Sequence, residues 1–312
     1  MAVPAESIAK IAARNLTSDL DLTQEELACL LDLTARVKRT PAAYARALAG
    51  RYLSLLFEKP SLRTRLTFEL AIKQLGGDAV ASHGPIVGRD PLQDVARNLD
   101  RWTQGIAARV FSQTTISELA RWSAVPVINA LSDLYHPCQA LADVFTLKER
   151  FGGLRGLRLA FVGDGNNVAH SLMLTATRLG ADFALATPPG YGPNPEIVAQ
   201  AQGLAAAAGT RLTITNDAAE ALAGAQAVYT DVWTSMGHEK EAERRRRVFE
   251  PYQVNEELFA LAGPQALFMH CLPARRGEEV TDAVIESPRS AVFDQAENRL
   301  HTQKALLLML IE

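Results

Sequence analysis

Residues 52–77 read YLSLLFEKPSLRTRLTFELAIKQLGG and predict one strand–loop–helix unit. The apolar run Tyr52–Phe57 is typical of a buried strand, and Pro60 ends it. Ser61 is a residue type preferred at helix N-caps, and Gly76-Gly77 ends the helix that follows. A strand that leads directly into a helix is the repeating unit of α/β proteins, so this stretch favours a parallel sheet covered by helices.

The same stretch has the features of an anion site. Backbone N–H groups at a helix start point outward, and the helix dipole favours a negative charge there. Arg63 and Arg65 add forked donors suited to phosphate oxygens. Taken alone, the pattern is equally compatible with Ser61 acting only as an N-cap and with both arginines on a solvated helix face.

Strand-like and helix-like segments alternate along the rest of the chain. This favours an α/β fold with two lobes, each a mainly parallel sheet flanked by helices. A capping box, Thr23-x-x-Glu26, opens the first expected helix, and residues 133–150 predict a long helix beside a turn that contains His136-Pro137. Further strands are expected at 107–111, 125–129, 158–162, 183–187, 211–215, 227–231 and 267–270.

Gly152-Gly153 and Gly156 interrupt this pattern and mark the expected boundary between the lobes. We therefore predict a first domain over residues 1–150 and a second over 151–296. The last helix, within 297–312, is expected to pack back on the first domain. Ligands of such lobes bind outside the carboxyl ends of the strands, so the active site is expected in the cleft between the lobes.

The composition of the chain limits which binding partners and which cellular compartment are expected. The 312 residues are 48% apolar and 21% charged with a net charge of −3, which gives no reason to expect nucleic acid as a partner. No run is apolar enough to span a bilayer and no secretory signal is recognisable, so no membrane partner is expected. Three scattered cysteines without disulfide or zinc spacing favour a reducing, cytoplasmic compartment and no metal. The run Arg244–Arg247 follows several glutamates and is interpreted as a solvated helix face.

The motif Gly163-Asp164-Gly165-Asn166-Asn167-Val168 follows a strand and opens a helix, as a nucleotide-binding loop would. Val168 replaces the third glycine of that pattern, and the next strand ends in Thr187-Pro188-Pro189, which offers no carboxylate for a ribose. We therefore disfavour a dinucleotide-dependent oxidoreductase and expect no organic cofactor. A turn with two asparagines is better suited to a small polar or zwitterionic ligand.

Two further motifs place polar side chains just after expected strands. His136-Pro137-Cys138-Gln139 sets an imidazole and an amide at a helix start, where they could donate to a carbonyl or phosphate oxygen. Alternatively, the histidine caps only its own loop. The segment 231–237, DVWTSMG, could hold an ammonium and a carboxylate group with its acid and hydroxyl, or could form an ordinary Asx turn.

The last two motifs lie near the C-terminus. His270-Cys271-Leu272-Pro273 ends a short apolar strand with a thiol, which is either inert packing or a nucleophile that needs a positioned base. Glu297-Asn298-Arg299 opens the expected final helix, and Arg299 either reaches an anionic ligand or stays in solvent.

Together these motifs resemble the aspartate/ornithine carbamoyltransferase family, and the resemblance runs from about Leu20 to the C-terminus. Each signature is modestly specific, but all of them in the family's order are highly specific. They are Ser61-x-Arg63-Thr64-Arg65, His136-Pro137-x-Gln139, Asp231-x-Trp233-x-Ser235-Met236-Gly237 and His270-Cys271-Leu272-Pro273.

The resemblance implies transfer of the carbamoyl group of carbamoyl phosphate to the δ-amine of L-ornithine, in arginine biosynthesis or catabolism, without metal or organic cofactor. It implies a homotrimer, or a multiple of trimers, with sites at subunit interfaces. It assigns carbamoyl phosphate to Ser61, Leu62, Arg63, Thr64, Arg109, His136, Gln139, Cys271, Leu272 and Arg299. It assigns ornithine to Asn167, Asp231, Ser235 and Met236, and catalysis to Arg109, His136, Asp231 and Cys271.

Two points stay open at this stage. Many bacterial family members have a glutamine that reaches the phosphate of a neighbouring subunit, but this chain has Ile86 there, with Asp90-Pro91 in place of the usual acidic-Ser pair. The acceptor could also be putrescine, N-acetylornithine or aspartate, or the chain could be a relative that binds without turnover. The segment 231–237 and Cys271 favour an acceptor with a free α-amino acid head.

Overall fold

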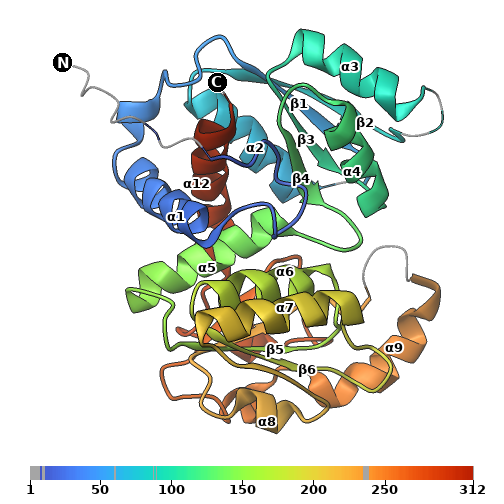
Figure 1. Cartoon of the computed structure of the whole chain (residues 1–312). Helices are drawn as coiled ribbons and strands as arrows, with labels where there is room; N and C mark the ends of the chain where they lie inside the picture. The colour runs from blue at the N-terminus through green and yellow to red at the C-terminus, as the bar shows by residue number, and fades with distance from the viewer. Residues whose placement is uncertain are drawn as a thin grey trace. The chain divides into compact units, whose positions relative to one another are not determined.

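The computed structural model describes residues 8, 11–59, 61–86, 88, 90–234 and 239–311. The chain divides into two compact units (Figure 1): one is Met1–Phe145 with Glu297–Glu312, and the other is Thr146–Ala296. Each unit has a parallel sheet flanked by helices, so the predicted α/β class is confirmed. Within the described part of the chain, no helix combines the length and apolarity needed to cross a membrane.

The first unit contains a four-stranded parallel sheet with strand order β2-β1-β3-β4. Its strands are β1 (Tyr52–Phe57), β2 (Asp78–His83), β3 (Gly105–Arg109) and β4 (Val127–Leu131). β1 and β3 are central and almost wholly buried, which explains why they read as continuous apolar runs. β2 lies at an edge and is mostly exposed.

Three helices of this unit, α1, α2 and α4, begin at residues whose side chains cap them. The Thr23 hydroxyl accepts from the Glu26 N–H at 3.1 Å, and the Glu26 carboxylate accepts from the Thr23 N–H at 2.8 Å, so the capping box is confirmed. Lys38 donates to Asn298 at 2.8 Å, which links α1 to the last helix, drawn red in Figure 1. The helices are α1 (Gln24–Arg39), α2 (Leu62–Gln74), α3 (Leu92–Trp102), α4 (Gln113–Trp122), α5 (Pro137–Phe151) and α12 (Val292–Leu310), with a 3-10 turn at Pro41–Tyr44.

The second unit contains a five-stranded parallel sheet with strand order β7-β6-β5-β8-β9. Its strands are β5 (Arg158–Val162), β6 (Asp182–Ala186), β7 (Leu212–Thr215), β8 (Ala227–Thr230) and β9 (Leu267–His270). Its helices are α6 (Asn167–Arg178), α7 (Pro195–Ala208), α8 (Ala218–Leu222), α9 (Ala242–Phe249), α10 (Glu256–Phe259) and α11 (Asp282–Ile285), with 3-10 turns at Glu239–Glu241 and Glu250–Tyr252.

Two helices begin elsewhere than the sequence predicts. The last helix, α12, starts at Val292 rather than Glu297, and the N–H of Gln295 already bonds the carbonyl of Ala291 at 2.9 Å. The long helix α5 starts at Pro137 rather than at residue 133, because proline fits the first turn of a helix, where no N–H is needed. The two boundaries between the units fall inside these two helices.

The four-arginine run is not uniformly solvated, so its interpretation as a solvated helix face is wrong for one member. Arg246 and Arg247 lie on the exposed side of α9 and pair with Glu278 and Glu243. Arg245 is only 6% exposed. It packs against the rings of Tyr191 and Phe249, which cover its guanidinium.

Candidate active site

The polar motifs lie at the point in each sheet where the order of successive strands reverses. In the first unit β1 leads to β2 on one side and β3 leads to β4 on the other, so the carboxyl ends of β1 and β3 form the switch point. Ser61 follows β1, and Arg109 ends β3. In the second unit the switch point lies between β5 and β8, which lead to Asn166 and Asp231. Ligands of open α/β sheets bind at such points.

Ser61 acts as the N-cap of α2, and its hydroxyl accepts from the N–H of Thr64 at 3.3 Å. Leu62 is the first residue of the helix and is 67% exposed. Its side chain has no polar group, so only its backbone N–H can donate to a ligand at the helix start. Arg63 is half-buried in the same turn. Arg65 lies beside the edge strand instead, with its guanidinium 3.4 Å from the His83 ring.

Arg299 joins the start of α2 to the start of α5. Its Nη2 donates to the Thr64 hydroxyl at 2.8 Å, and its Nη1 donates to the side-chain oxygen Oε1 of Gln139 at 3.0 Å. The Gln139 amide in turn donates to Asp143 at 2.8 Å. Arg299 is 3% exposed, so it is held within this network and does not remain in solvent.

His136 is buried in cationic surroundings just before α5. Burial lowers the pKa of this imidazole well below its usual value, and the positive charges of Arg299, Arg109 and Arg63 lower it further. The histidine is therefore neutral at physiological pH, and the positive charge near it is that of the arginines. A neutral imidazole among guanidinium groups suits an anionic ligand whose oxygen needs a hydrogen-bond donor.

The lowered pKa of His136 predicts a specific loss of stability in acid. The unfolded chain takes up a proton as the pH falls below about 6.5, while the folded chain does not, so stability is present above that pH and declines below it. We expect His136→Gln to show a shallower decline of the unfolding free energy between about pH 7.5 and 5, measured by urea titration. His83→Gln, at an exposed histidine, is the control. Equal slopes for wild type and His136→Gln would contradict the lowered pKa.

Ile86 is half-buried at the margin of its own unit's core. Its side chain packs against the cluster that contains Ile106 and Ile116, and its N–H donates to Glu58 at 3.2 Å. The other Glu58 oxygen accepts from the N–H of Phe111 at 2.9 Å. Glu58 therefore links the segments that follow β2 and β3, and Ile86 offers no polar group to a phosphate.

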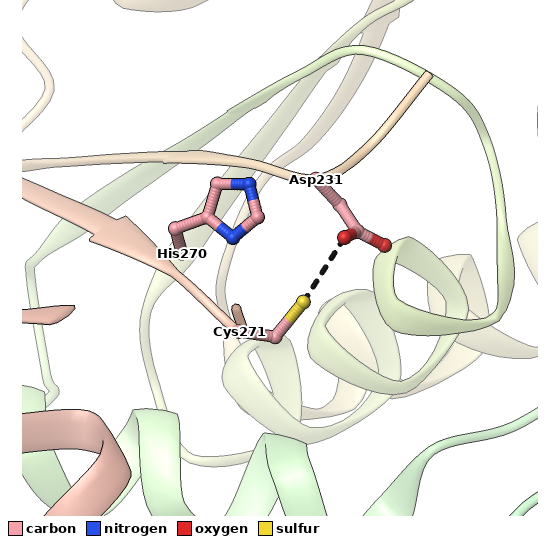
Figure 2. A group of neighbouring side chains, drawn as sticks. All are labelled: Asp231, His270 and Cys271. Atoms are coloured by element: carbon pink, nitrogen blue, oxygen red, sulfur yellow. Dashed lines mark hydrogen bonds between the residues drawn. The ribbon is translucent and has the colours of Figure 1, made fainter. Parts of the chain in front are cut away.

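Asp231 is the centre of the polar cluster in the second unit. Its Oδ1 accepts from the Cys271 thiol at 3.0 Å and from the Val232 N–H at 2.8 Å, and its Oδ2 accepts from the Asn166 amide at 2.8 Å. Figure 2 shows the thiol directed at the carboxylate, with the His270 ring beside the pair. We refer to Asn166, Asp231 and Cys271 as the Asp231 cluster.

His270 does not act as a base for Cys271. Its Nδ1 accepts from the Leu272 N–H at 2.9 Å, so its Nε2 bears the proton and faces Glu279 at 3.2 Å. Glu279 also accepts from the Arg275 N–H at 2.6 Å, and both His270 and Glu279 are completely buried. This pair holds the turn after β9, in which Leu272 has a positive φ of 57°. Sequence reasoning missed Glu279, because no spacing signal relates it to His270.

The ligand atoms of Asp231, His270 and Cys271 all lie within 4.8 Å of one another, close enough to meet a metal ion. Each is already engaged in a hydrogen bond, and a metal would have to displace the thiol proton and the Leu272 N–H. The expectation that no metal takes part stays a prediction.

Asn167, which is expected to bind ornithine, follows a second asparagine that contacts Asp231. The Asn166 amide donates to Asp231, and Asn166 is also the N-cap of α6. Asn167 is half-buried as the first residue of the helix. Ser235 and Met236 lie outside the described residues, as does Pro60 in the first unit.

Two family models cover most of the chain. The one described as "Aspartate/ornithine carbamoyltransferase, carbamoyl-P binding domain" matches residues 14–149, and the one described as "Aspartate/ornithine carbamoyltransferase, Asp/Orn binding domain" matches residues 155–310. The chain belongs to the aspartate/ornithine carbamoyltransferase family. The enzymatic class expected from its motifs is thereby confirmed.

Individual carbamoyltransferases align with the chain over nearly its whole length. It is 50% identical over 303 residues to the ornithine carbamoyltransferase of Acidothermus cellulolyticus, covering 96% of this chain and 97% of that protein. The solved structure of ornithine carbamoyltransferase from Pyrococcus furiosus matches with a TM-score of 0.94 at 46% identity, covering 97% and 99% of the two chains. An acetylornithine transcarbamylase complexed with acetylcitrulline matches with a TM-score of 0.87 at 33% identity, covering 96% and 99%. Carbamoyltransferases with different acceptors thus share this fold, and the acceptor must be argued from side chains.

Proposed function

We propose that this chain is an ornithine carbamoyltransferase, which converts carbamoyl phosphate and L-ornithine to L-citrulline and phosphate in arginine biosynthesis or catabolism. One observation carries the proposal: this chain, a member of the family, has both a buried cationic network around Arg299 and a carboxylate–thiol pair, Asp231 and Cys271. The first suits a phosphorylated donor. The second suits a primary amine that must lose a proton.

We assign carbamoyl phosphate mainly to the first unit and ornithine to the second. The helix start at Ser61 supplies backbone donors for the phosphate, and the neighbouring arginines supply charge. Cys271 and Leu272 of the second unit are assigned to both substrates. The remaining assigned residues are Leu62, Arg63, Thr64, Arg109, His136, Gln139 and Arg299 for the donor, and Asn167, Asp231, Ser235 and Met236 for the acceptor.

The chemistry requires the amine as a free base. The δ-ammonium of ornithine, with a lysine-like pKa of about 10, first loses a proton. The nitrogen lone pair then bonds to the carbonyl carbon, and the carbonyl oxygen becomes an oxyanion that Thr64, Arg109 and His136 stabilise as fixed donors. When the oxyanion collapses, the bond from carbon to the phosphate oxygen breaks and phosphate leaves with the electron pair. The nitrogen gives its second proton to the departing phosphate.

Asp231 and Cys271 are proposed to receive or tune the first amine proton. The Asp231 carboxylate already accepts from three donors, which hold it in one orientation as a hydrogen-bond acceptor. An ammonium group that approaches this acceptor is oriented before it is deprotonated. No step requires a metal or organic cofactor, since carbamoyl phosphate is already activated.

A ureido-product assay with carbamoyl phosphate and ornithine, putrescine, N-acetylornithine or aspartate tests the acceptor. We expect kcat/KM for L-ornithine to exceed that for each of the others by about 100-fold or more. Putrescine and N-acetylornithine lack the free α-amino acid head, and aspartate lacks the δ-amine. Preference for another amine would overturn the acceptor assignment. Absence of turnover with every amine would favour a binding protein without catalysis.

A homotrimer, or a multiple of trimers, is proposed as the working state. Leu62, Leu66 and Leu70 recur every four residues on α2 and are 67%, 40% and 45% exposed, and Val80 on the edge strand β2 is 62% exposed. Such an apolar surface beside the anion site is suited to burial against another copy. Sedimentation is expected to give three times the chain mass of 33.8 kDa, or a multiple of that. A monomeric wild type would contradict the proposal.

A cytoplasmic location is also proposed. Its support is the use of cysteine: Cys29, Cys138 and Cys271 are all free thiols, as a reducing compartment requires. Burial raises the pKa of the Cys138 thiol to about 12, so this one is inert. Fractionation of cells that express the tagged chain would contradict the proposal if the protein were recovered outside the cytoplasm.

A further inference from the structure

Arg245 is the buried member of the four-arginine run, and the proposed chemistry does not use it. Its side chain is 8% exposed, whereas the side chains of Arg246 and Arg247 on the same helix are 54% and 78% exposed. Taking a guanidinium out of water is costly unless charge and hydrogen bonds compensate. The contacts that compensate Arg245 therefore indicate what it holds in place.

Arg245 connects three segments of the second unit that are distant in sequence. Its Nη1 donates to the Asp164 carboxylate at 2.8 Å and to the Trp233 carbonyl oxygen at 2.8 Å. Its guanidinium lies 4.9 Å from the centre of the Tyr191 ring. These contacts tie α9 to the turn after β5, to the segment after β6 and to the segment after β8.

The segments held by Arg245 carry Asn166 and Asp231 of the Asp231 cluster. Asp231 is two residues before Trp233, and Asn166 is two residues after Asp164, whose carbonyl oxygen accepts from the Asn166 N–H at 2.8 Å. The turn is also tight: the Gly165 N–H donates to the Tyr191 carbonyl at 2.9 Å, and a Cβ on Gly165 would lie 2.3 Å from the nitrogen of Pro193. The bond between Asn166 and Asp231 depends on how these segments are placed against each other.

We propose that Arg245 is a positioning residue for the acceptor: through Asp164 and Trp233 it fixes the spacing of Asn166 and Asp231, and so sets the affinity for the amine substrate. This inference rests on the proposed function for the identity of the amine. It does not place Arg245 in contact with substrate. A loss of Arg245 should therefore weaken use of the acceptor and leave use of carbamoyl phosphate unchanged.

Arg245→Met tests the proposal, with Arg247→Met as a matched control on the same helix. Methionine keeps much of the side-chain volume and removes the charge and donors. We expect the KM for ornithine to rise about tenfold or more, with kcat falling less and the KM for carbamoyl phosphate within about twofold of wild type. Arg247 pairs with the exposed Glu243, and its variant should match wild type within about twofold in all constants.

Two further variants separate positioning from a loss of folding. Asp164→Asn keeps the shape of the partner and should raise the KM for ornithine in the same direction but less. Arg245→Lys keeps the charge and should restore part of the affinity. If Arg245→Met does not fold, these two decide the question. In the double variant Arg245→Met with Asp164→Asn, the rise in KM should not exceed that of Arg245→Met alone, since Arg245→Met already removes the contact that Asp164→Asn weakens.

Several outcomes would overturn the inference: an unchanged KM for ornithine in a folded Arg245→Met enzyme, equal rises in both KM values, or additive effects of the two substitutions. The proposed function fails separately. If wild type prefers another amine of the panel, that amine replaces ornithine in the same comparison and its KM should rise. If no amine is turned over, calorimetric binding of ornithine to wild type, Arg245→Met and Arg247→Met gives the same comparison.

Discussion

Replacing Arg299 by methionine is expected to lower kcat/KM for carbamoyl phosphate by about 1,000-fold. One guanidinium donates to Thr64 at 2.8 Å and to Gln139 at 3.0 Å, so the substitution removes a positive charge and frees the starts of two helices at once. It also leaves two buried polar groups without their donor, at a cost of about 1–3 kcal/mol each in stability. The pKa of His136 should rise toward its usual value, because one of its neighbouring charges is gone.

Steady-state kinetics with each substrate varied in turn would measure this effect. Arg299→Lys keeps the charge but has no planar fork for two acceptors, so its loss should be intermediate. Arg121→Met, at a 69% exposed arginine of α4, is the control and should resemble wild type. A loss below about tenfold for a folded Arg299→Met enzyme, or one confined to ornithine, would contradict the assignment of this network to carbamoyl phosphate.

Asp231→Asn is expected to lower kcat/KM for ornithine by about 1,000-fold with little change in the KM for carbamoyl phosphate. An amide cannot replace this carboxylate, because both of its oxygens accept. Whichever position the new NH₂ group takes, it meets a donor, either the Asn166 amide or the Cys271 thiol and the Val232 N–H. The cluster therefore loses both its charge and its geometry.

The pH dependence of kcat/KM distinguishes a proton acceptor from a purely structural carboxylate. Asp282→Asn, at a residue 73% exposed and paired with Arg276, should leave the profile unchanged. Cys271→Ser keeps a donor for Asp231, but a hydroxyl is a weaker acid than a thiol. This variant should therefore reduce kcat by about tenfold and shift the pH profile of kcat/KM. An unchanged pH profile for Cys271→Ser would count against a role for the thiol in tuning the amine proton.

Local signals predicted the elements that their own residues stabilise. The capping box at Thr23 and the N-cap at Ser61 were visible because the side chain and the N–H that it accepts from lie three residues apart. The edge strand β2 was missed because its residues, DAVASH, are mostly exposed and have no apolar pattern. The true start of α12 was missed because its first turn is held by tertiary contacts and not by a capping residue: Val292 lies in the core cluster and Gln295 accepts from the His270 N–H.

Candidate site residues could be found one motif at a time, but their connections could not. Arg299 meets Thr64 across 235 positions of the chain, and Arg245 meets Asp164 across 81. Neither pairing has a spacing rule. The run at Arg244–Arg247 illustrates the limit: four identical residues have no sequence feature that says which one is buried.

The sequence alone determined the α/β class, the family and the residue types at the ends of the strands, because strand and helix periodicity and short motifs are local. Only the tertiary structure decided that Arg299 is buried between Thr64 and Gln139, that the Asn166 amide bonds Asp231, and that His270 faces Glu279. Hydrogen bonds and ion pairs depend on distances that the folded chain creates. A motif can therefore indicate the chemistry of a site, but the hydrogen-bond partner of each polar atom is known only from the folded structure.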